Sequence, residues 1–458
     1  MKTMKSLRLT FAALIAFAFS TQNSGATDTP QDSITCMDYT SEAIEKKPPV
    51  TDLSNEPMVF VYNLRYKGEK EKLAIKEIAM QRYIRQMRTG YGQVGTPNFV
   101  VSDSKANAIF AIGGYVEFRT GYNFMGNVDN TDFVTYDIPI SYTPADRQAL
   151  LMDASTSRIY FKSLINTKPL GTIEAYIETD FRGTGNSLRL REAYVKFKGL
   201  TFGQTVSAFC DLDAAFNTID FEGPNAYSYR RNLAIQYNLA LGCGWSMAAA
   251  LEMPTLSATY DEYSEAIPQR IFDVPLYVQY AWNEHNHLRL SGILRTMNYY
   301  NTLDMCDEHL FGWGVQFSGR VNMGRVGRLF GMMTYGEGIA QYIQDLQGTG
   351  MDLVPNCNTT GKMSVPQAMA WFGGMEFNLT KRLPVTIGYS QVHLFNNDGA
   401  YDISGSDYKL AQYIVGNIFY NISSGMSVGM EYLYGTRYDY DGAFGTASRV
   451  QAAIKLNF

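Results

Sequence analysis

The chain has 458 residues, of which 46% are hydrophobic and 14% aromatic, with 40 Gly and a formal net charge of −5. The abundance of Tyr, Phe and Gly favours many strands and turns over a helical bundle. The net charge is only mildly negative and does not point to nucleic acid, so we expect no nucleic-acid partner.

The first 26 residues have the form of a secretory signal peptide. Lys2, Lys5 and Arg8 precede the apolar run LTFAALIAFAF, and Ser24-Gly25-Ala26 supplies small residues for a cleavage site. An uncleaved anchor helix is the alternative, but the apolar run is too short to span a bilayer. We therefore expect residues 1–26 to be cleaved and the protein to be exported.

Residues 27–106 are predicted to form a separate N-terminal segment. Its first part is polar and has little periodicity, which is typical of a flexible chain. Residues 69–88 place Leu73, Ile84 and Met87 near one face, which predicts a short amphipathic helix in the periplasm. This helix would either pack on a neighbouring surface or form a short trimerising stalk.

Residues 107–458 repeat segments of roughly ten to sixteen residues in which apolar and polar positions alternate. In GTIEAYIETDF, for example, Ile173 and Ile177 alternate with Glu174 and Glu178. We count about sixteen such segments, and they are longer than the usual strands of a soluble sandwich. An even number of long alternating strands is typical of a bacterial transmembrane barrel.

One segment departs from the alternation. In SLRLREAYVKF, Leu188 and Leu190 share parity with Glu192, whereas Arg191 shares parity with Val195. Either a β-bulge lies near Arg191 or the first part of the segment stands above the membrane.

The predicted connections alternate between short and long. The short turns are NTKP, KGL, LGCGW, NEHNH, NMGRVG, TKRLP and SSGM, and the long loops are residues 125–153, 210–226, 255–269, 301–308, 344–366 and 397–408. Tight turns at one end and long loops at the other are typical of an outer-membrane barrel. The sequence therefore predicts an all-β, up-and-down antiparallel transmembrane barrel of about sixteen strands.

The last ten residues, RVQAAIKLNF, also alternate and finish on Phe458. Because a bilayer offers no water to an unpaired sheet edge, we expect this strand to close against the first one. A terminal Phe on an alternating strand is similar to the signature by which outer-membrane proteins are recognised for assembly.

Charged residues on the faces opposite the apolar ones predict a wet interior. The residues assigned to the lumen are Glu117, Arg119, Arg158, Lys162, Glu174, Glu178, Arg230, Arg289, Arg295, Arg449 and Lys455. Unpaired charges at this density would be costly in a closed core but not in a water-filled channel. A barrel filled by a polar plug is the alternative, although sixteen strands leave room for water.

The third outer loop, at residues 210–226, provides a candidate constriction. Its acidic residues are Asp211, Asp213, Asp220 and Glu222, and the basic wall residues that would face them are Arg119, Arg158, Lys162, Arg230 and Arg231. If the loop folds into the barrel, the two sets form a transverse field that orients charged solutes. A solvated loop with turns around Gly223-Pro224-Asn225 is the alternative. Arg230 and Arg231 are neighbours, so only one of the two can face the lumen of a regular strand.

Several stretches resemble the DcaP-like family of trimeric outer-membrane porins, in a form typical of Bacteroidetes-type bacteria. They are IGGYVEFRTGY, ASTSRIYFKS, IETDFRG, LRLREAYV and GQTVSAFCDLDAAFNTIDFEGPNAY, together with the final Phe. The likeness is clearest over residues 112–237. The resemblance implies a barrel of sixteen strands, a homotrimer in outer-membrane lipid, and passive uptake of small solutes, often anions such as dicarboxylates.

The leading hypothesis is a diffusion porin that prefers small anions, and the alternative is a structural or adhesive barrel whose long outer loops bind a ligand. We predict no enzyme, because no His except His393, near Ser390, approaches the register of a catalytic set. We also predict no cofactor or metal, since the sequence lacks a phosphate loop, zinc spacing or a nucleotide fingerprint. Cys306 and Cys357 would pair only if their loops meet.

Overall fold

The computed structural model describes residues 58–61, 99–103, 107–126, 128, 131–283, 285–324, 326–380, 382–396, 407–423 and 425–458. All of them belong to one compact unit, residues 44–458. The predicted signal peptide and the predicted helix at residues 69–88 lie outside the described residues. In the described part of the chain, no helix has the length and apolar character needed to cross a bilayer.

The described residues form strands joined by turns and loops. The strands are β1 Met58–Val61, β2 Phe99–Ser102, β3 Ala108–Met125, β4 Ala149–Asp153, β5 Arg158–Thr167, β6 Gly171–Asp180, β7 Arg189–Phe197, β8 Leu200–Val206, β9 Arg231–Gly242, β10 Trp245–Glu252, β11 Ser264–Ala266, β12 Val274–Asn283, β13 Asn286–Asn301, β14 Cys306–Asn322, β15 Arg328–Glu337, β16 Val354–Pro355, β17 Met363–Ser364, β18 Gln367–Thr380, β19 Leu383–Phe395, β20 Tyr408–Asn421, β21 Met426–Asp439 and β22 Phe444–Asn457. Single turns of 3-10 helix lie in the loops: η1 Thr135–Asp137, η2 Pro144–Asp146, η3 Thr184–Asn186, η4 Leu212–Ala214, η5 Ala340–Tyr342 and η6 Gln344–Leu346.

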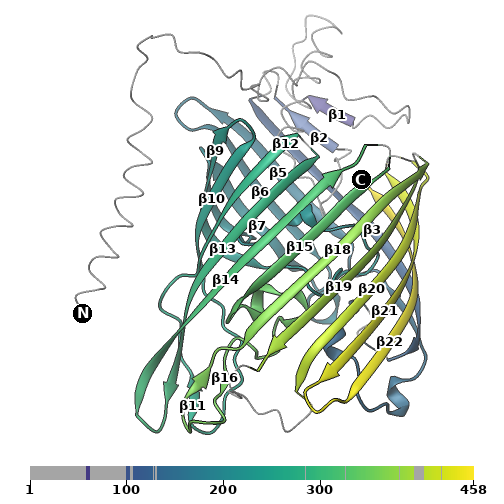
Figure 1. Cartoon of the computed structure of the whole chain (residues 1–458). Coiled ribbons are helices and arrows are strands. Elements are labelled where there is room, and N and C mark those ends of the chain that lie inside the picture. The colour runs from purple at the N-terminus through teal and green to yellow at the C-terminus, as the bar shows by residue number, and fades with distance from the viewer. Residues whose placement is uncertain are drawn as a thin grey trace, which may run out of the picture. The chain divides into compact units, whose positions relative to one another are not determined.

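Sixteen strands close into one antiparallel barrel. The ring runs in chain order through β3, β5 to β10, β12 to β15 and β18 to β22, as the tilted ribbons of Figure 1 show. It closes where β22 pairs with β3, from Ser448 opposite Met125 to Asn457 opposite Tyr115. The predicted barrel of about sixteen strands, and the closure of the last strand on the first, are confirmed.

Two short strands extend the sheet beside the barrel seam. The backbone groups of Phe458 and Gly114 exchange two hydrogen bonds of 3.0 Å, and β2 then pairs with the next stretch of β3, beginning with Phe99 opposite Ile112. β1 adds to β2 in parallel, with Met58 opposite Phe99. The sequence analysis placed both strands in the N-terminal segment and did not predict them.

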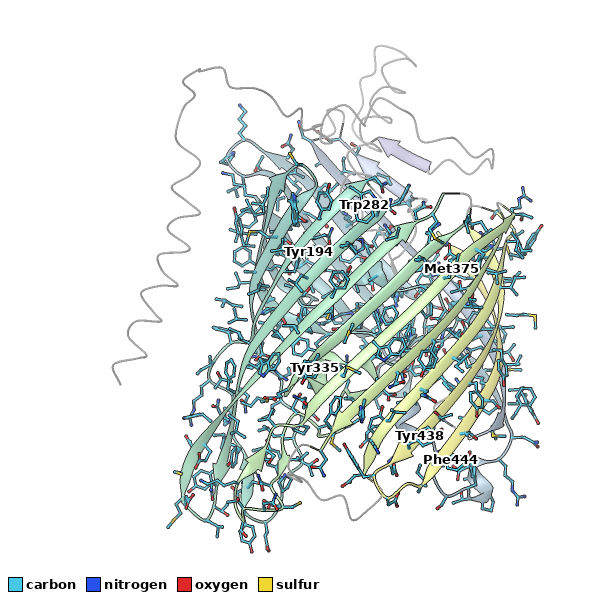
Figure 2. The ribbon with its side chains drawn as sticks, in the orientation of Figure 1. Tyr194, Trp282, Tyr335, Met375, Tyr438 and Phe444 are labelled. Atoms are coloured by element: carbon cyan, nitrogen blue, oxygen red, sulfur yellow. The ribbon has the colours of Figure 1, made fainter. Side chains whose placement is uncertain are left out.

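The alternation in sequence becomes an apolar outer face and a polar inner face. On β3, Val116 and Phe118 are exposed on the outside, whereas Glu117 and Arg119 are buried inside the barrel. The same pattern recurs around the ring, and Figure 2 shows the apolar side chains that project from its outer surface. A closed sheet with an apolar outer band is the form in which β-structure can cross a bilayer.

Aromatic side chains lie near both ends of the outer surface. At the end with the short turns, Trp245 packs on Tyr280 with ring centroids 4.8 Å apart, and Tyr280 packs on Trp282 at 6.2 Å. At the opposite end, Tyr438 stacks on Phe444 with ring centroids 5.9 Å apart (Figure 2). Two aromatic rows separated by an aliphatic band are typical of the girdles that contact lipid headgroups.

The turns at one end of the barrel are tight, as predicted. Between β7 and β8, Lys198 and Gly199 both have positive φ, of 46° and 80°, which fits the type I′ turns that join twisted strands in two residues. At the other end, one prediction was wrong. The predicted loop at residues 301–308 is only the turn at residues 302–305, because β13 and β14 form a long hairpin that pairs as far as Asn301 and Cys306.

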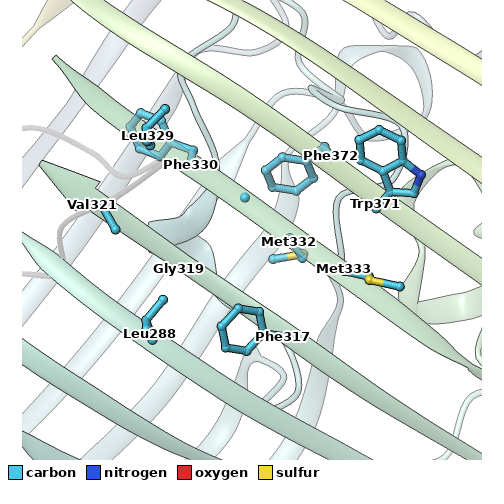
Figure 3. A pocket seen from close by; sticks show the side chains of 11 residues that line it. Leu288, Phe317, Gly319, Val321, Leu329, Phe330, Met332, Met333, Trp371 and Phe372 are labelled. Atoms are coloured by element: carbon cyan, nitrogen blue, oxygen red, sulfur yellow. The ribbon is translucent and has the colours of Figure 1, made fainter. Parts of the chain in front are cut away.

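An apolar groove of about 390 Å³ crosses the outer face of β13, β14, β15 and β18. It exists because Gly319 and Gly331 occupy outward positions between larger neighbours such as Leu288, Phe317 and Met333 (Figure 3). The groove is lined by apolar side chains, so it offers no reactive chemistry, and we look for the functional site inside the barrel.

Candidate functional site

The loop Ser207–Arg230, called the inward loop below, runs from β8 to β9 and folds into the barrel. Its first anchor is Asp211, whose carboxylate accepts a hydrogen bond of 2.6 Å from Ser318 and lies 2.8 Å from the His287 Nε2. Burial opposes ionisation, but the charge of Arg289 and these two partners outweigh it and hold the pKa of Asp211 below its usual range. The loop is therefore tied to β13 and β14, which are three and four strands further along the ring than β9.

The middle of the inward loop is packed by aromatic rings. Phe216 is fully buried, with its ring 5.7 Å from that of Phe372 and 6.5 Å from that of Phe330. It lies over Gly374 and Gly388, which face each other on β18 and β19. The two glycines leave room for the ring, and this contact fixes the loop against the barrel wall.

The next anchor is formed by Asp220. The backbone N–H groups of Ile219 and Asp220 donate to the Glu431 carboxylate at 2.8 and 2.7 Å. The Asp220 side chain accepts hydrogen bonds of 3.0 Å from the Phe133 backbone N–H and from the Tyr413 hydroxyl. Burial, together with the charge of Glu431, raises the pKa of Asp220 to about 7.

Two other acidic residues of the inward loop are less well satisfied. Glu222 is buried, and its Oε2 has no hydrogen-bond partner among the described residues. Burial and the nearby charges of Asp345 and Asp132 raise its pKa well above the usual value. Burial and the charge of Asp211 likewise raise the pKa of Asp213. At neutral pH these positions contribute less negative charge than the sequence suggests.

Basic side chains gather on the inner face of β3, β5 and β7. This basic wall consists of Arg119, Arg158, Lys162 and Arg191, all buried inside the barrel. Their carboxylate partners lie on the same wall: Arg119 pairs with Glu117, Arg158 with Glu178 at 3.6 Å, Lys162 with Glu174 at 3.4 Å, and Arg191 with Glu178 and Asp180 at 2.7 Å each. The inner wall is therefore a network of ion pairs rather than a row of isolated charges.

A stack of tyrosines supports this network. Tyr160, Tyr176 and Tyr194 stack across β5, β6 and β7 with ring centroids 5.6 and 5.4 Å apart (Tyr194 is labelled in Figure 2). The Tyr176 hydroxyl donates to Glu178 at 2.8 Å, and the Tyr194 hydroxyl donates to Glu174 at 2.9 Å. These bonds fix Glu178, which pairs with Arg158 and Arg191, and Glu174, which pairs with Lys162.

Arg191 owes its place to a β-bulge. In the pairing of β6 with β7, Glu178 lies opposite Glu192 but Thr179 lies opposite Leu190, so Arg191 is the extra residue. As a result, Arg191 and Glu192 are both buried inside although they are neighbours in sequence. Of the two alternatives left open by the sequence, the structure contains the bulge.

The first and sixth outer loops also enter the barrel, which the sequence analysis did not predict. Thr135 of the first loop and Asp345 of the sixth share a hydrogen bond of 2.8 Å, and the Asn225 amide of the inward loop donates to Thr135 at 2.7 Å. Arg295 on β13 holds the sixth loop through Asp352 at 3.0 Å. The interior is therefore more filled than the open, wet lumen predicted from sequence.

The predicted site residues fall into separate groups. Arg119, Arg158 and Lys162 belong to the basic wall, whereas Asp211 and Asp220 make their described bonds to strands on other sides of the barrel. Arg230 donates to Asn232 at 3.3 Å. The guanidinium of Arg231 lies 4.7 Å from the ring centre of Tyr229 and donates to its hydroxyl.

The sequence analysis missed three residues of this region as site candidates: Arg182, Arg191 and Phe221. The change of parity near Arg191 was a usable signal, since it placed a charged residue where an outward apolar one was expected. Arg182 and Phe221 lie in loops, where no periodicity reports direction. Separately, Cys306 is a free thiol, so it forms no disulfide with Cys357.

Comparisons with known proteins agree with this architecture. Residues 93–274 match the model of the DcaP outer membrane protein family. The crystal structure of the outer membrane channel DcaP of Acinetobacter baumannii is 21% identical, with a TM-score of 0.67, and the match covers 80% of this chain and 100% of that one. The anion-selective porin from Comamonas acidovorans is 11% identical, with a TM-score of 0.51, covering 77% and 100%. Comparison with curated protein sequences gives no significant match.

The structural matches establish the porin-type barrel fold, and the family match places this barrel in the outer membrane. The resemblance to DcaP-like proteins, made from short stretches of sequence, is thereby confirmed.

Proposed function

We propose that this outer-membrane barrel, which resembles DcaP-like porins, allows passive diffusion of small hydrophilic solutes and prefers anions. The observation that carries the proposal is the group of arginines on one inner wall, opposite an inward loop whose Asp220 and Glu222 have raised pKa values. Fixed positive charge in a narrow, partly desolvated passage attracts anions and repels cations.

Four carboxylates, Glu117, Glu174, Glu178 and Asp180, pair with the four cations of the basic wall, so the proposed preference rests on N–H donors that these pairs leave available. Each arginine of the wall has a carboxylate partner, but Arg119 Nη1 and Arg231 Nε have no hydrogen-bond partner among the described residues. Both groups are donors, and neither can bind a cation. Solutes that carry two carboxylates would gain most from several donors on one wall, so we extend the proposal to dicarboxylates.

Planar-bilayer recording tests the proposal directly. Purified protein should give stepwise conductance, and under a potassium chloride gradient the reversal potential should favour chloride. Arg158→Gln should reduce this preference, whereas Arg270→Gln, which removes a 57% exposed side chain from an outer loop, should leave it unchanged. Absence of conductance would refute the channel, and preference for potassium would refute the selectivity.

The dicarboxylate part has its own measurement. Succinate added to one side should block the chloride current at lower concentration than acetate does. Equal block by both would remove the dicarboxylate proposal and leave the anion channel. The proposed homotrimer, which rests on the family resemblance, would appear as three copies in native mass spectrometry from detergent, and a monomer would refute it.

A further inference from the structure

Phe221, in the inward loop, lies among four guanidinium groups. The distances from its ring centre to the guanidinium carbons are 5.7 Å for Arg119, 5.6 Å for Arg158, 4.5 Å for Arg182 and 5.4 Å for Arg191. Three of these arginines come from β3, β5 and β7, and the fourth follows β6. One loop side chain thus contacts cations from four successive strands of the barrel.

The guanidinium groups are held by their edges. Each donates to or pairs with a carboxylate: Arg119 with Glu117, Arg158 with Glu178, Arg182 with Asp132 at 2.7 Å, and Arg191 with Asp180. A guanidinium that is fixed by its N–H groups keeps its flat faces available, and the face of an aromatic ring attracts such a cation. The ring of Phe221 therefore contacts a positively charged surface of guanidinium faces. A carboxylate side chain in its place would neutralise this charge, and an aliphatic side chain would lack the cation–π attraction.

Hydrogen bonds to the barrel wall hold the backbone on either side of Phe221. Asp220 is bonded to Glu431 through its backbone N–H at 2.7 Å, and the Ala226 N–H donates to Ser390 Oγ at 2.9 Å. These bonds tie the inward loop to β21 and β19. Phe221 points the other way, toward β3 to β7, so the loop spans the barrel and is attached at both sides.

We propose that Phe221 is a specificity-determining residue, a latch that holds the inward loop against the basic wall and so sets the size limit of the channel. The inference rests on the proposed diffusion function and deepens it. The attachment on the β19 and β21 side uses several hydrogen bonds. On the arginine side, Arg191 donates to the Tyr229 hydroxyl at 3.3 Å near the end of the loop, and the ring of Phe221 holds the middle of the loop. Loss of that ring frees the middle of the loop and widens the passage along the basic wall.

The test uses the full-length protein in planar bilayers and in liposome-swelling assays with sugars of increasing size. Phe221→Leu keeps an apolar side chain of similar volume but removes the ring face, so conductance should rise by about twofold or more and larger sugars should enter. Phe221→Tyr retains the face and should behave as the wild type. The matched control is Phe118→Leu, the same change at an outward position that is 43% exposed and adjacent to Arg119 in sequence.

Each outcome decides the inference. Wild-type conductance and size limit in Phe221→Leu would overturn the latch while leaving the channel intact. If the wild type itself conducts no ions, the proposed function fails first. Folding is checked by the shift in electrophoretic mobility on heating. If the Leu variant does not fold, Phe221→Ala serves instead, and unchanged permeation in that variant would equally overturn the proposal.

Discussion

The ring of Phe216 lies against Gly374 so closely that a Cβ at this position would overlap the ring. Phe216 of the inward loop thus fits where Gly374 on the barrel wall has no side chain, although the two residues are 158 positions apart in the sequence. Because protein interiors are close-packed, the pair behaves as one unit.

Gly374→Ala should therefore displace the inward loop. The overlap predicts a loss of stability of about 1–3 kcal/mol, since Phe216 is enclosed and cannot move aside freely. The measurement is equilibrium unfolding in detergent. Gly373→Ala is the matched control, because a Cβ there meets nothing within 4 Å. Adding Phe216→Ala should remove the extra cost of Gly374→Ala, and purely additive effects of the two changes would contradict the contact.

Arg295 holds the sixth outer loop from inside the barrel. It is 2% exposed and contacts Asp273 at 3.1 Å and Asp352 at 3.0 Å. Arg295→Met leaves both carboxylates buried without this partner and should cost about 3–5 kcal/mol of unfolding free energy. Arg270→Met, which breaks an exposed pair, should cost no more than about 1 kcal/mol. Equal losses in the two variants would show that burial does not determine the effect.

The raised pKa of Asp220 predicts a dependence of stability on pH. Its value moves from the ordinary 3.8 to about 7 because of burial and the charges of Glu431 and Asp132. Between these values the folded protein keeps a proton that the unfolded chain has lost, so the contribution of this group to stability falls as pH rises. Asp220→Asn removes the titration. Its Oδ1 can still accept from the Phe133 N–H, and its Nδ2 can donate to the Tyr413 hydroxyl oxygen.

The melting temperature of Asp220→Asn relative to the wild type should accordingly increase from pH 4 to pH 8. The control is Asp146→Asn, in an exposed loop. Hydrogen bonds from Thr143 lower the pKa of Asp146, so its shift is opposite in direction to that of Asp220. A constant difference between Asp220→Asn and the wild type over this range would refute the prediction.

Arg191 should contribute more to anion preference than Arg189, which pairs with the same Asp180 carboxylate. Arg191→Gln removes a buried guanidinium that bonds Glu178 and Asp180, and we expect the chloride-to-potassium permeability ratio to fall by roughly twofold or more. Arg191→Lys keeps the charge and should restore part of the ratio. Arg189 pairs with Asp180 at 2.6 Å but is 39% exposed at the side chain, so Arg189→Gln should have the smaller effect. The reverse order would contradict the assignment of the basic wall.

The sequence was informative where the barrel repeats itself. Period-two alternation identifies which residues face lipid because the pleat admits only two faces, so Ile173 and Glu174 were assigned correctly. The alternation assigned Arg191 to the wrong face because the β-bulge inserts one extra residue, which reverses the order of inward and outward positions beyond it. Loops follow no such rule, since their paths depend on contacts distant in sequence. The bond between Thr135 and Asp345 joins residues 210 positions apart, and nothing local to either residue announces it.

The seam between β22 and β3 has a practical consequence. Only Gly113 separates the β3 residue that pairs with Phe458 from the one that pairs with Phe99. A purification tag or fluorescent fusion appended after Phe458 would therefore run directly into β2 and compete with it for the edge of β3. Labels placed in an outer turn, such as residues 302–305 between β13 and β14, avoid this competition and leave both ends of the seam as they are.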